Sequence, residues 1–197
     1  AAPEKNPYVV LDPVSKVNEH TEFPQLLEAA SDFEFWVKKE NKVSTMRSVL
    51  DVFFYPAQPQ SASHQAHMAL WSAIANDKMQ VLASKFGVAG VWAGISTSDM
   101  GLRLHVTTFK KQMPVAITEI MKQLDVAAVD QEQFEKMKQH LLDDLRGFKE
   151  SGPLTRGMHE LYVKLDKSIA NEELIAAVTR TSLAQFRANA QKMSFRV

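Results

Sequence analysis

The sequence of 197 residues has no cysteine, only seven glycines and no excess of charge of either sign. Without cysteine, disulfide scaffolds, thiolate zinc sites and cysteine nucleophiles are all excluded. Its 23 basic residues balance 23 acidic ones, whereas proteins that bind nucleic acid carry a clear basic excess. No stretch of the sequence approaches the roughly 18 consecutive apolar residues that span a bilayer. We therefore expect neither nucleic acid nor a membrane as a partner.

What the chain does contain is typical of a folded domain. Its composition is 45% hydrophobic and 23% charged, which excludes general disorder. It begins Ala1-Ala2-Pro3 without an initiator methionine or a recognisable signal peptide, and Phe195-Arg196-Val197 is typical of a strand that continues. We therefore expect the chain to be part of a longer polypeptide, with some of its function outside these residues.

The proline pattern divides the chain into two parts. Residues 1–32 are predicted to be an irregular N-terminal connector, because prolines that interrupt helices recur there and the run Ser15–Glu22 offers no apolar face. Residues 33–197 are predicted to form a single domain. The prolines of the connector are Pro3, Pro7, Pro13 and Pro24.

The hydrophobic pattern predicts strands first and helices later. Alternating residues favour strands at 33–38 and 47–55, and a hairpin at 91–97 and 102–109. A helix is expected at 61–86, ended by Gly87, with apolar stripes on two sides so that other elements cover it twice. The order predicts an α+β fold, with an antiparallel-rich sheet and helices packed on one face.

The second half of the chain is predicted to be mostly helical. Pro114 opens one helix, and Asp130 with Gln133 resembles a capping box that opens the next. Glu132–Lys136 and Glu135–Lys138 pairs at helical spacing predict a water-facing side for that helix. Ser151-Gly152-Pro153 should end it, and shorter helices follow, the last opened by Ser182 with Gln185. A final strand is expected to begin near Ser194.

His64 and His67 are the most metal-like pair in the sequence, because histidines three apart share one face of a helix. A zinc site needs at least a third ligand, and the next acidic residue is Asp77. The alternative is two polar histidines near a helix start, and this is the interpretation that we favour.

The remaining candidates also favour a non-catalytic domain. His105 is expected on a solvated sheet edge and His140 and His159 on polar helix faces, while adjacent Asp143 and Asp144 cannot point at one site. No glycine-rich phosphate loop and no nucleophile elbow is present. We therefore predict no catalytic, no cofactor-binding and no metal-ligating residue in this chain.

A series of short motifs occurs in order along the chain: Asn6-Pro7-Tyr8, Trp36–Lys39, Leu82-Ala83, Val88–Trp92, Ile95-Ser96, Gly101-Leu102, Val106, Phe109, Met113-Pro114, Phe134, Lys138 and Phe148. Together these motifs resemble the third, or middle, domain of the pitrilysin and insulin-degrading-enzyme family of zinc metallopeptidases. In this resemblance, Asn6-Pro7-Tyr8 is similar to the segment that leads out of the preceding half of those enzymes, and Trp36–Lys39 to the strand that begins the domain.

The resemblance implies a fold, a parent enzyme and a supporting role. The catalytic signature of the family is His-x-x-Glu-His, in which two histidines bind zinc and the glutamate activates water. Its nearest counterpart here, His64–Met68, has His67 in the glutamate place and Met68 in the second histidine place. No catalytic residue is therefore carried over, and zinc is expected only in the catalytic domain of the parent.

Three functional hypotheses remain open from the sequence. In the first, the chain is the non-catalytic domain of a zinc-dependent endopeptidase that acts on peptides, contacting the catalytic N-terminal half of the same polypeptide and walling a substrate chamber. In the second, the parent has lost catalysis and is a structural subunit. In the third, the chain is a peptide-binding module that uses the exposed edge of the hairpin. The pitrilysin resemblance implies the bacterial periplasm or cytoplasm.

Overall fold

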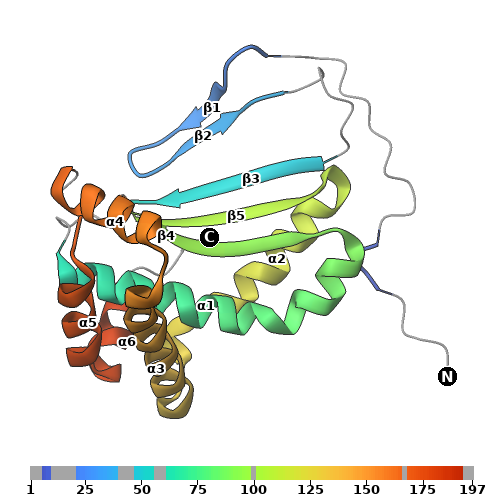
Figure 1. Cartoon of the computed structure of the whole chain (residues 1–197). Coiled ribbons are helices and arrows are strands. Elements are labelled where there is room, and N and C mark those ends of the chain that lie inside the picture. The colour runs from blue at the N-terminus through green and yellow to red at the C-terminus, as the bar shows by residue number, and fades with distance from the viewer. Residues whose placement is uncertain are drawn as a thin grey trace.

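The computed structural model describes residues 6–9, 21–39, 47–55, 61–98, 101–165 and 168–192. Within these ranges the chain has the expected α+β fold, in which helices collect around an antiparallel sheet (Figure 1). The final strand predicted near Ser194 lies outside the described residues, so that prediction stays open.

The main sheet is built from β3 (Arg47–Phe54), β4 (Trp92–Ser98) and β5 (Gly101–Phe109). The order of these described strands is β3-β5-β4, with antiparallel pairing on both sides of β5. The predicted hairpin of β4 and β5 is therefore confirmed, and β5 is the central one of the three described strands of the sheet. Along β5 the buried residues alternate with half-buried ones, so the sheet has a covered inner face and a more open outer face.

The long helix α1 (Ala62–Ala89) begins where the sequence predicts but ends later. The Ser61 side chain accepts a hydrogen bond from the His64 backbone N–H and caps its start. The prediction that Gly87 ends it is wrong, because Gly90 takes the left-handed conformation with φ of +72°. A Cβ atom at Gly90 would also lie 3.1 Å from the Phe109 ring, so backbone and space both demand glycine there.

The core lies between the inner face of the sheet and α1. Helix α2 (Met113–Gln123) also contacts β5, while α3 (Gln131–Gly147), α5 (Asn171–Arg180) and α6 (Leu183–Lys192) contact α1. The prediction that α1 is covered twice holds for Leu70 and Ile74, which are fully buried, but fails at Val81, which is 67% exposed. The C-terminal half of α1 therefore keeps an uncovered side.

The predicted helix starts and breaks are largely confirmed. Asp130 accepts a hydrogen bond from the Gln133 backbone N–H at 2.8 Å, and Ser182 exchanges hydrogen bonds with Gln185 at the start of α6. Helix α4 (Pro153–Leu165) follows the expected break. The predicted water-facing side of α3 is confirmed at Glu132, Glu135 and Lys136, which are exposed. Lys138 does not pair with Glu135, because its Nζ donates to the carbonyls of Thr179 and Thr181 at the end of α5.

The second half of the predicted connector is not irregular. Residues 25–29 form β1 (Gln25–Ala29), which pairs antiparallel with β2 (Glu34–Val37). Pro24 lies just before the strand, where its missing N–H costs no ladder bond. The expectation of irregular structure is therefore wrong here, because pairing with β2 supplies the order that local pattern did not indicate.

The first described segment, Asn6–Val9, is held against the far end of α1. The Asn6 side chain donates to the Lys85 carbonyl at 2.7 Å, and the Tyr8 ring meets the Phe86 ring edge-on at 4.9 Å. Gln112 donates to the Tyr8 carbonyl. Burial of Tyr8 raises the pKa of its hydroxyl. The lead-in to the domain is thereby anchored to its core.

Candidate functional site

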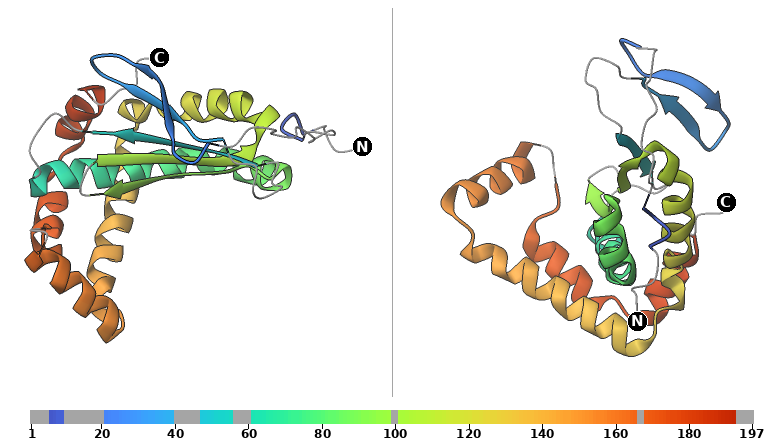
Figure 2. Two further views of the ribbon diagram at one scale, coloured as in Figure 1. Left: turned by 90° about the horizontal axis from the view of Figure 1, so that it is seen from above. Right: turned by 90° about the vertical axis from the view of Figure 1, so that its right-hand side faces the viewer.

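The outer face of the main sheet is the first candidate site, and we define it by seven side chains. Figure 2 shows α2 on one side of this sheet, with α3 and α4 extending on the other side. Along each strand the outer-face side chains alternate with side chains that are buried or packed against the core, so they point away from the core. They are Val49, Asp51 and Phe53 of β3, Trp92 of β4, and Arg103, His105 and Thr107 of β5.

A row of hydrogen-bonded polar groups crosses this outer face. Arg103 Nε donates to Asp51 Oδ1 at 2.8 Å, and His105 Nδ1 lies 2.7 Å from the same oxygen. Since an ionised carboxylate only accepts, His105 Nδ1 donates to it, and the His105 Nε2 lies 3.0 Å from the Thr107 hydroxyl oxygen. The hydrogen bond from Arg103 is the main cause that lowers the pKa of Asp51, with a smaller contribution from His105.

This row has the order carboxylate, imidazole, hydroxyl, but it lacks the rest of a nucleophilic site. Such catalysis requires backbone N–H donors for an oxyanion close to the hydroxyl. Thr107 lies on β5, whose backbone is paired with β3 on one side and β4 on the other. We assign the row a structural role. The prediction that His105 lies on a sheet edge is wrong, because β5 is central among the described strands.

Aromatic side chains border the polar row. The Phe53 and Tyr55 rings stack at 6.3 Å, and the Arg103 guanidinium lies 5.6 Å from the centre of the Phe53 ring. Trp92 is 59% exposed and Phe53 is 50% exposed. Exposed aromatic residues beside arginine are the composition of binding hot spots. The outer face is thus suited to bind a partner rather than to react.

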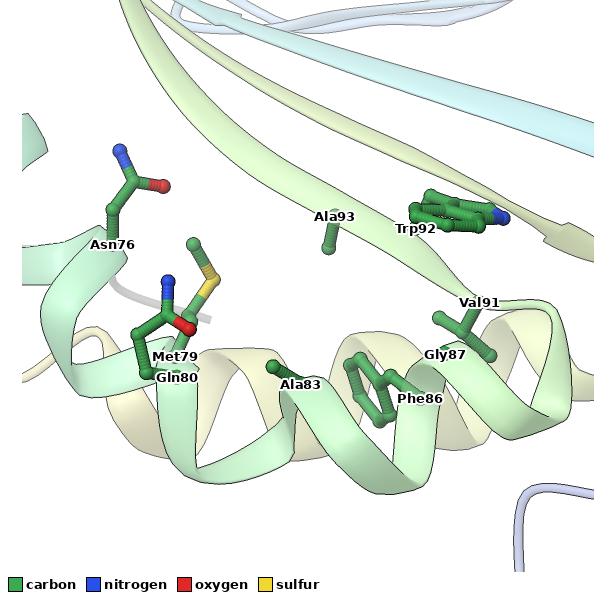
Figure 3. Close-up of a pocket in the computed structure, with 9 residues that line it drawn as sticks. All are labelled: Asn76, Met79, Gln80, Ala83, Phe86, Gly87, Val91, Trp92 and Ala93. Carbon is green, nitrogen blue, oxygen red and sulfur yellow. The ribbon is translucent and has the colours of Figure 1, made fainter.

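A pocket between α1 and β4 is the second candidate site (Figure 3). It has a volume of about 160 Å³ and lies beside Asn76 and Gln80 on the helix and Val91 and Ala93 on the strand. The remaining lining residues are apolar or glycine: Met79, Ala83, Phe86, Gly87 and Trp92. With no charged side chain in the lining, the pocket favours an uncharged, apolar group.

One end of this pocket is closed by a side-chain clamp on β4. The Asn76 amide donates to the Ile95 carbonyl at 2.7 Å and accepts from the Ile95 N–H at 3.0 Å. The Ser72 hydroxyl donates to the same carbonyl at 2.9 Å. Helix α1 therefore satisfies both backbone groups that Ile95 turns to the open edge, as an adjoining strand would.

The other predicted residues are dispersed. Asp143 lies 3.6 Å from Arg146, whereas Asp144 lies 3.2 Å from His140 on the exposed side of α3. The two carboxylates thus have different partners, as the sequence predicts. The His159 ring, expected on a polar face, is half-buried and meets the Phe148 ring at 4.8 Å. These residues do not converge on a site.

Sequence reasoning missed the two residues that organise these surfaces, Asp51 and Asn76. Asp51 meets Arg103 and His105 only because β3 and β5 pair across more than fifty residues. Asn76 directly follows the mostly apolar run Met68–Ala75 of α1. A polar residue beside such a run is a usable signal, because burying an amide is costly unless it finds partners.

Comparison with known proteins identifies the domain. Residues 1–177 match a family described as the middle or third domain of peptidase M16. The chain belongs to the peptidase M16 family. It is similar to the insulin-degrading enzymes of Bos taurus and Homo sapiens, with 21% identity to each, and in both cases the match covers 94% of this chain and 19% of the relative.

Solved structures agree on the fold of this M16 domain. The crystal structure of pitrilysin superposes on 98% of the chain with a TM-score of 0.82 at 15% identity, and this region is 21% of that protein. The periplasmic protease PqqL from Escherichia coli matches 76% of the chain with a TM-score of 0.55 at 9% identity. The chain thus spans about a fifth of the length of these relatives.

Zinc, which the M16 family implies for its catalytic domain, does not fit the described part of this domain. Among the described residues, no group of three histidine, cysteine, aspartate or glutamate side chains lies close enough together to hold a metal ion. His67 is 8% exposed, and its Nδ1 lies 2.6 Å from the Ser63 carbonyl. Burial and the neighbouring His67 lower the pKa of His64.

Both histidines lie near the start of α1, as predicted. Their Nε2 atoms are buried and have no hydrogen-bond partner among the described residues. Two imidazoles are still one ligand short of a zinc site. We derive no metal chemistry from them.

The described helices include none that is long and apolar enough to cross a membrane.

Proposed function

We propose that this M16 middle domain is a non-catalytic part of a zinc-dependent metalloendopeptidase. In this proposal it contacts the other domains of the same polypeptide, including the catalytic N-terminal half, and forms part of the wall of a chamber that encloses peptide substrates. The length of the relatives supports the proposal, since about four-fifths of each lies outside the matched region. The zinc and the water-activating base would belong to that other part.

The outer face of the main sheet is the observation that carries this proposal. Val49, Phe53 and Trp92 each expose at least half of their surface, although they neighbour an ordered row of hydrogen bonds. In an isolated domain such a patch is a liability, because exposed apolar patches promote association. As the inner wall of a closed chamber, it would instead offer a rigid surface to peptides.

Further exposed apolar surface supports the contacts with other domains. Helix α4 presents an apolar stripe at helical spacing with exposed fractions from 40% to 80%, and a helix of this length is marginal in water unless it packs against a neighbour. The stripe consists of Leu154, Met158, Leu161, Tyr162 and Leu165. The hairpin of β1 and β2 exposes Leu26, Leu27, Phe35 and Trp36.

The test uses the full parent enzyme and a quenched fluorescent peptide. Replacing Phe53 and Trp92 together by serine is expected to lower kcat/KM several-fold through KM, while the zinc content of the parent stays unchanged. Val88→Ser is the matched control, because Val88 is 80% exposed but lies on α1 and not on the outer face. Equal kinetics for the two variants would contradict the role of the outer face.

The same experiment separates the hypothesis of a catalytically active parent from the hypothesis of a parent that has lost catalysis. The parent is expected to contain an intact His-x-x-Glu-His string and to cleave the peptide, whereas the 197-residue chain alone is expected to cleave none. A parent without that string and without cleavage would instead be a structural member of the family. In that case we would expect the outer face to contact other subunits of an assembly rather than a peptide substrate.

A further inference from the structure

We propose that the pocket between α1 and β4 is a subsite for one uncharged, apolar side chain of an extended peptide, whose backbone pairs with β4 at Ala93. The inference deepens the proposed function and rests on it for its biological meaning, because a peptidase chamber would present extended peptides to this edge. The binding itself is a property of the described residues and can be tested on the chain alone.

The pocket has the shape that such a side chain needs. Its volume of about 160 Å³ is of the order of a leucine or phenylalanine side chain. Ala83 and Gly87, one turn apart on α1, create the space, and a Cβ atom built on Gly87 would meet nothing within 4 Å. Met79 and Phe86 are buried and supply apolar walls. A larger residue at position 83 would therefore fill the pocket.

The backbone of β4 supplies the second part of the site. The N–H and C=O of Ile95 point away from β5, since both bond to Asn76. Because backbone groups two residues apart point to the same side of a strand, those of Ala93 face the same open edge. No described residue is bonded to them. An unpaired N–H and C=O beside an apolar pocket match the chemistry of an extended peptide.

The side chains of β4 place the incoming residue over α1. Figure 3 shows Val91 and Ala93 directed toward the helix and Trp92 on the other side of the strand. A peptide strand added at this edge would alternate in the same way, so the residue beside Ala93 directs its side chain into the space above Ala83 and Gly87. The pocket and the free backbone groups therefore belong to one site.

The Asn76 clamp limits how far such a peptide can pair. Ile95 already has both backbone groups satisfied by Ser72 and Asn76, and the Val91 N–H donates to the Phe86 carbonyl at 2.9 Å, so pairing is confined to the N–H and C=O of Ala93. The clamp therefore sets the register and makes the site short. A short site of this kind explains how an edge strand can accept a peptide without supporting continuous strand addition.

The experiment is an NMR titration of the isotopically labelled 197-residue chain with the capped pentapeptide acetyl-Thr-Thr-Leu-Thr-Thr-amide. A saturable shift is expected for the Ala93 amide, with binding at least tenfold weaker when the peptide carries aspartate in place of leucine. Methylation of the leucine backbone nitrogen is expected to abolish the Ala93 shift, because that nitrogen can no longer donate.

Two variants of the chain complete the test. Ala83→Leu fills the pocket and is expected to weaken binding at least tenfold, whereas Ser84→Leu, also at an exposed position of α1, should leave it unchanged. Circular dichroism checks that both variants fold. The proposal would be overturned if Ala83→Leu left the affinity for the peptide unchanged, or if the methylated peptide still bound. Chemical shifts that change with the concentration of the chain in the absence of peptide would also overturn it, because the site would then bind a second copy of the chain.

Failure of this site and failure of the proposed function give different results. Phe53 lies on the outer face and does not line the pocket, so the kinetics of a parent with Phe53→Ser alone do not depend on the pentapeptide site. Trp92 lines the pocket as well, so the single Phe53 variant is the one that keeps the two failures apart. Conversely, a catalytically inactive parent does not alter peptide binding by the isolated chain.

Discussion

The two faces of one sheet have opposite surroundings although they come from the same three described strands. On the inner face, Leu102, Leu104 and Val106 of β5 are at most 2% exposed beneath the helices. On the outer face, the residues between them are half-buried polar groups that bond to one another. The comparison shows that the inner face holds the fold together, while the outer face is ordered without being covered.

The largest expected effect is on the inner face. Leu104→Ala should lower the free energy of unfolding by about 3 kcal/mol, because it leaves a cavity in a close-packed core. Urea denaturation followed by tryptophan fluorescence measures this loss. A loss below about 1 kcal/mol would mean that the inner face is less tightly packed than the structure shows.

The edge of the sheet should respond less strongly. Asn76→Ala removes both hydrogen bonds from its side chain to Ile95 and should cost about 1–2 kcal/mol, because the Ile95 N–H loses its partner and the Ile95 C=O keeps only the Ser72 hydroxyl. Hydrogen exchange at the Ile95 amide should speed up in the same variant. Gln80→Ala, exposed one turn further along α1, is the control and should leave that amide unchanged.

The contribution of the outer polar row to the free energy of unfolding should depend on pH. Arg103 and His105 lower the pKa of Asp51 below its ordinary value of 3.8, so the native state holds this proton less tightly than the unfolded state. The resulting stabilisation is complete above that value and is lost as pH falls below it. Asp51→Asn should therefore cost at most about 1 kcal/mol at neutral pH.

Acid titration separates this prediction from a simple structural disturbance. The difference in stability between Asp51→Asn and the unmodified chain should shrink as pH falls through the range below 3.8, as followed by thermal denaturation. A constant difference from pH 7 to pH 3 would show that the charge of Asp51 contributes nothing. Asn keeps the size of the side chain, so packing changes little.

The smallest expected effect is a change at an exposed apolar position. Val49→Ala on the outer face, where the valine is 59% exposed, should change stability by less than about 0.5 kcal/mol. Val106→Ala is the matched comparison on the fully buried inner face and should cost more than about 1 kcal/mol in the same denaturation experiment. Equal costs for the two valines would remove the distinction between the faces.

Local signals predicted the elements whose order depends on near neighbours. Asp130 and Ser182 cap helices through partners three residues away, and the turn between β4 and β5 joins adjacent strands. Such features are encoded within a few residues, so they can be read without knowledge of the fold. The water-facing side of α3 was predicted for the same reason, and Glu132 and Glu135 on it are exposed.

The errors share a different cause, which is a partner distant in the sequence. Gly87 and Gly90 both suit a helix end, but it is Gly90 that takes the left-handed conformation, beside the Phe109 ring of β5. Lys138 was expected to pair within its own helix, but the carbonyls at the end of α5 lie closer to its ammonium group. His105 looked solvated because its carboxylate partner comes from a strand more than fifty residues earlier.

The sequence by itself determined the class of fold, the positions of most helices and strands, the family resemblance and the lack of a His-x-x-Glu-His string. These depend on periodicity and on residue identity, which are written along the chain. Only the tertiary structure decided that Asp51 joins Arg103 and His105, and that Asn76 clamps Ile95 beside an open pocket. Hydrogen bonds across strands and between helix and sheet depend on register and packing, and a linear pattern of residues does not contain the distances that select them.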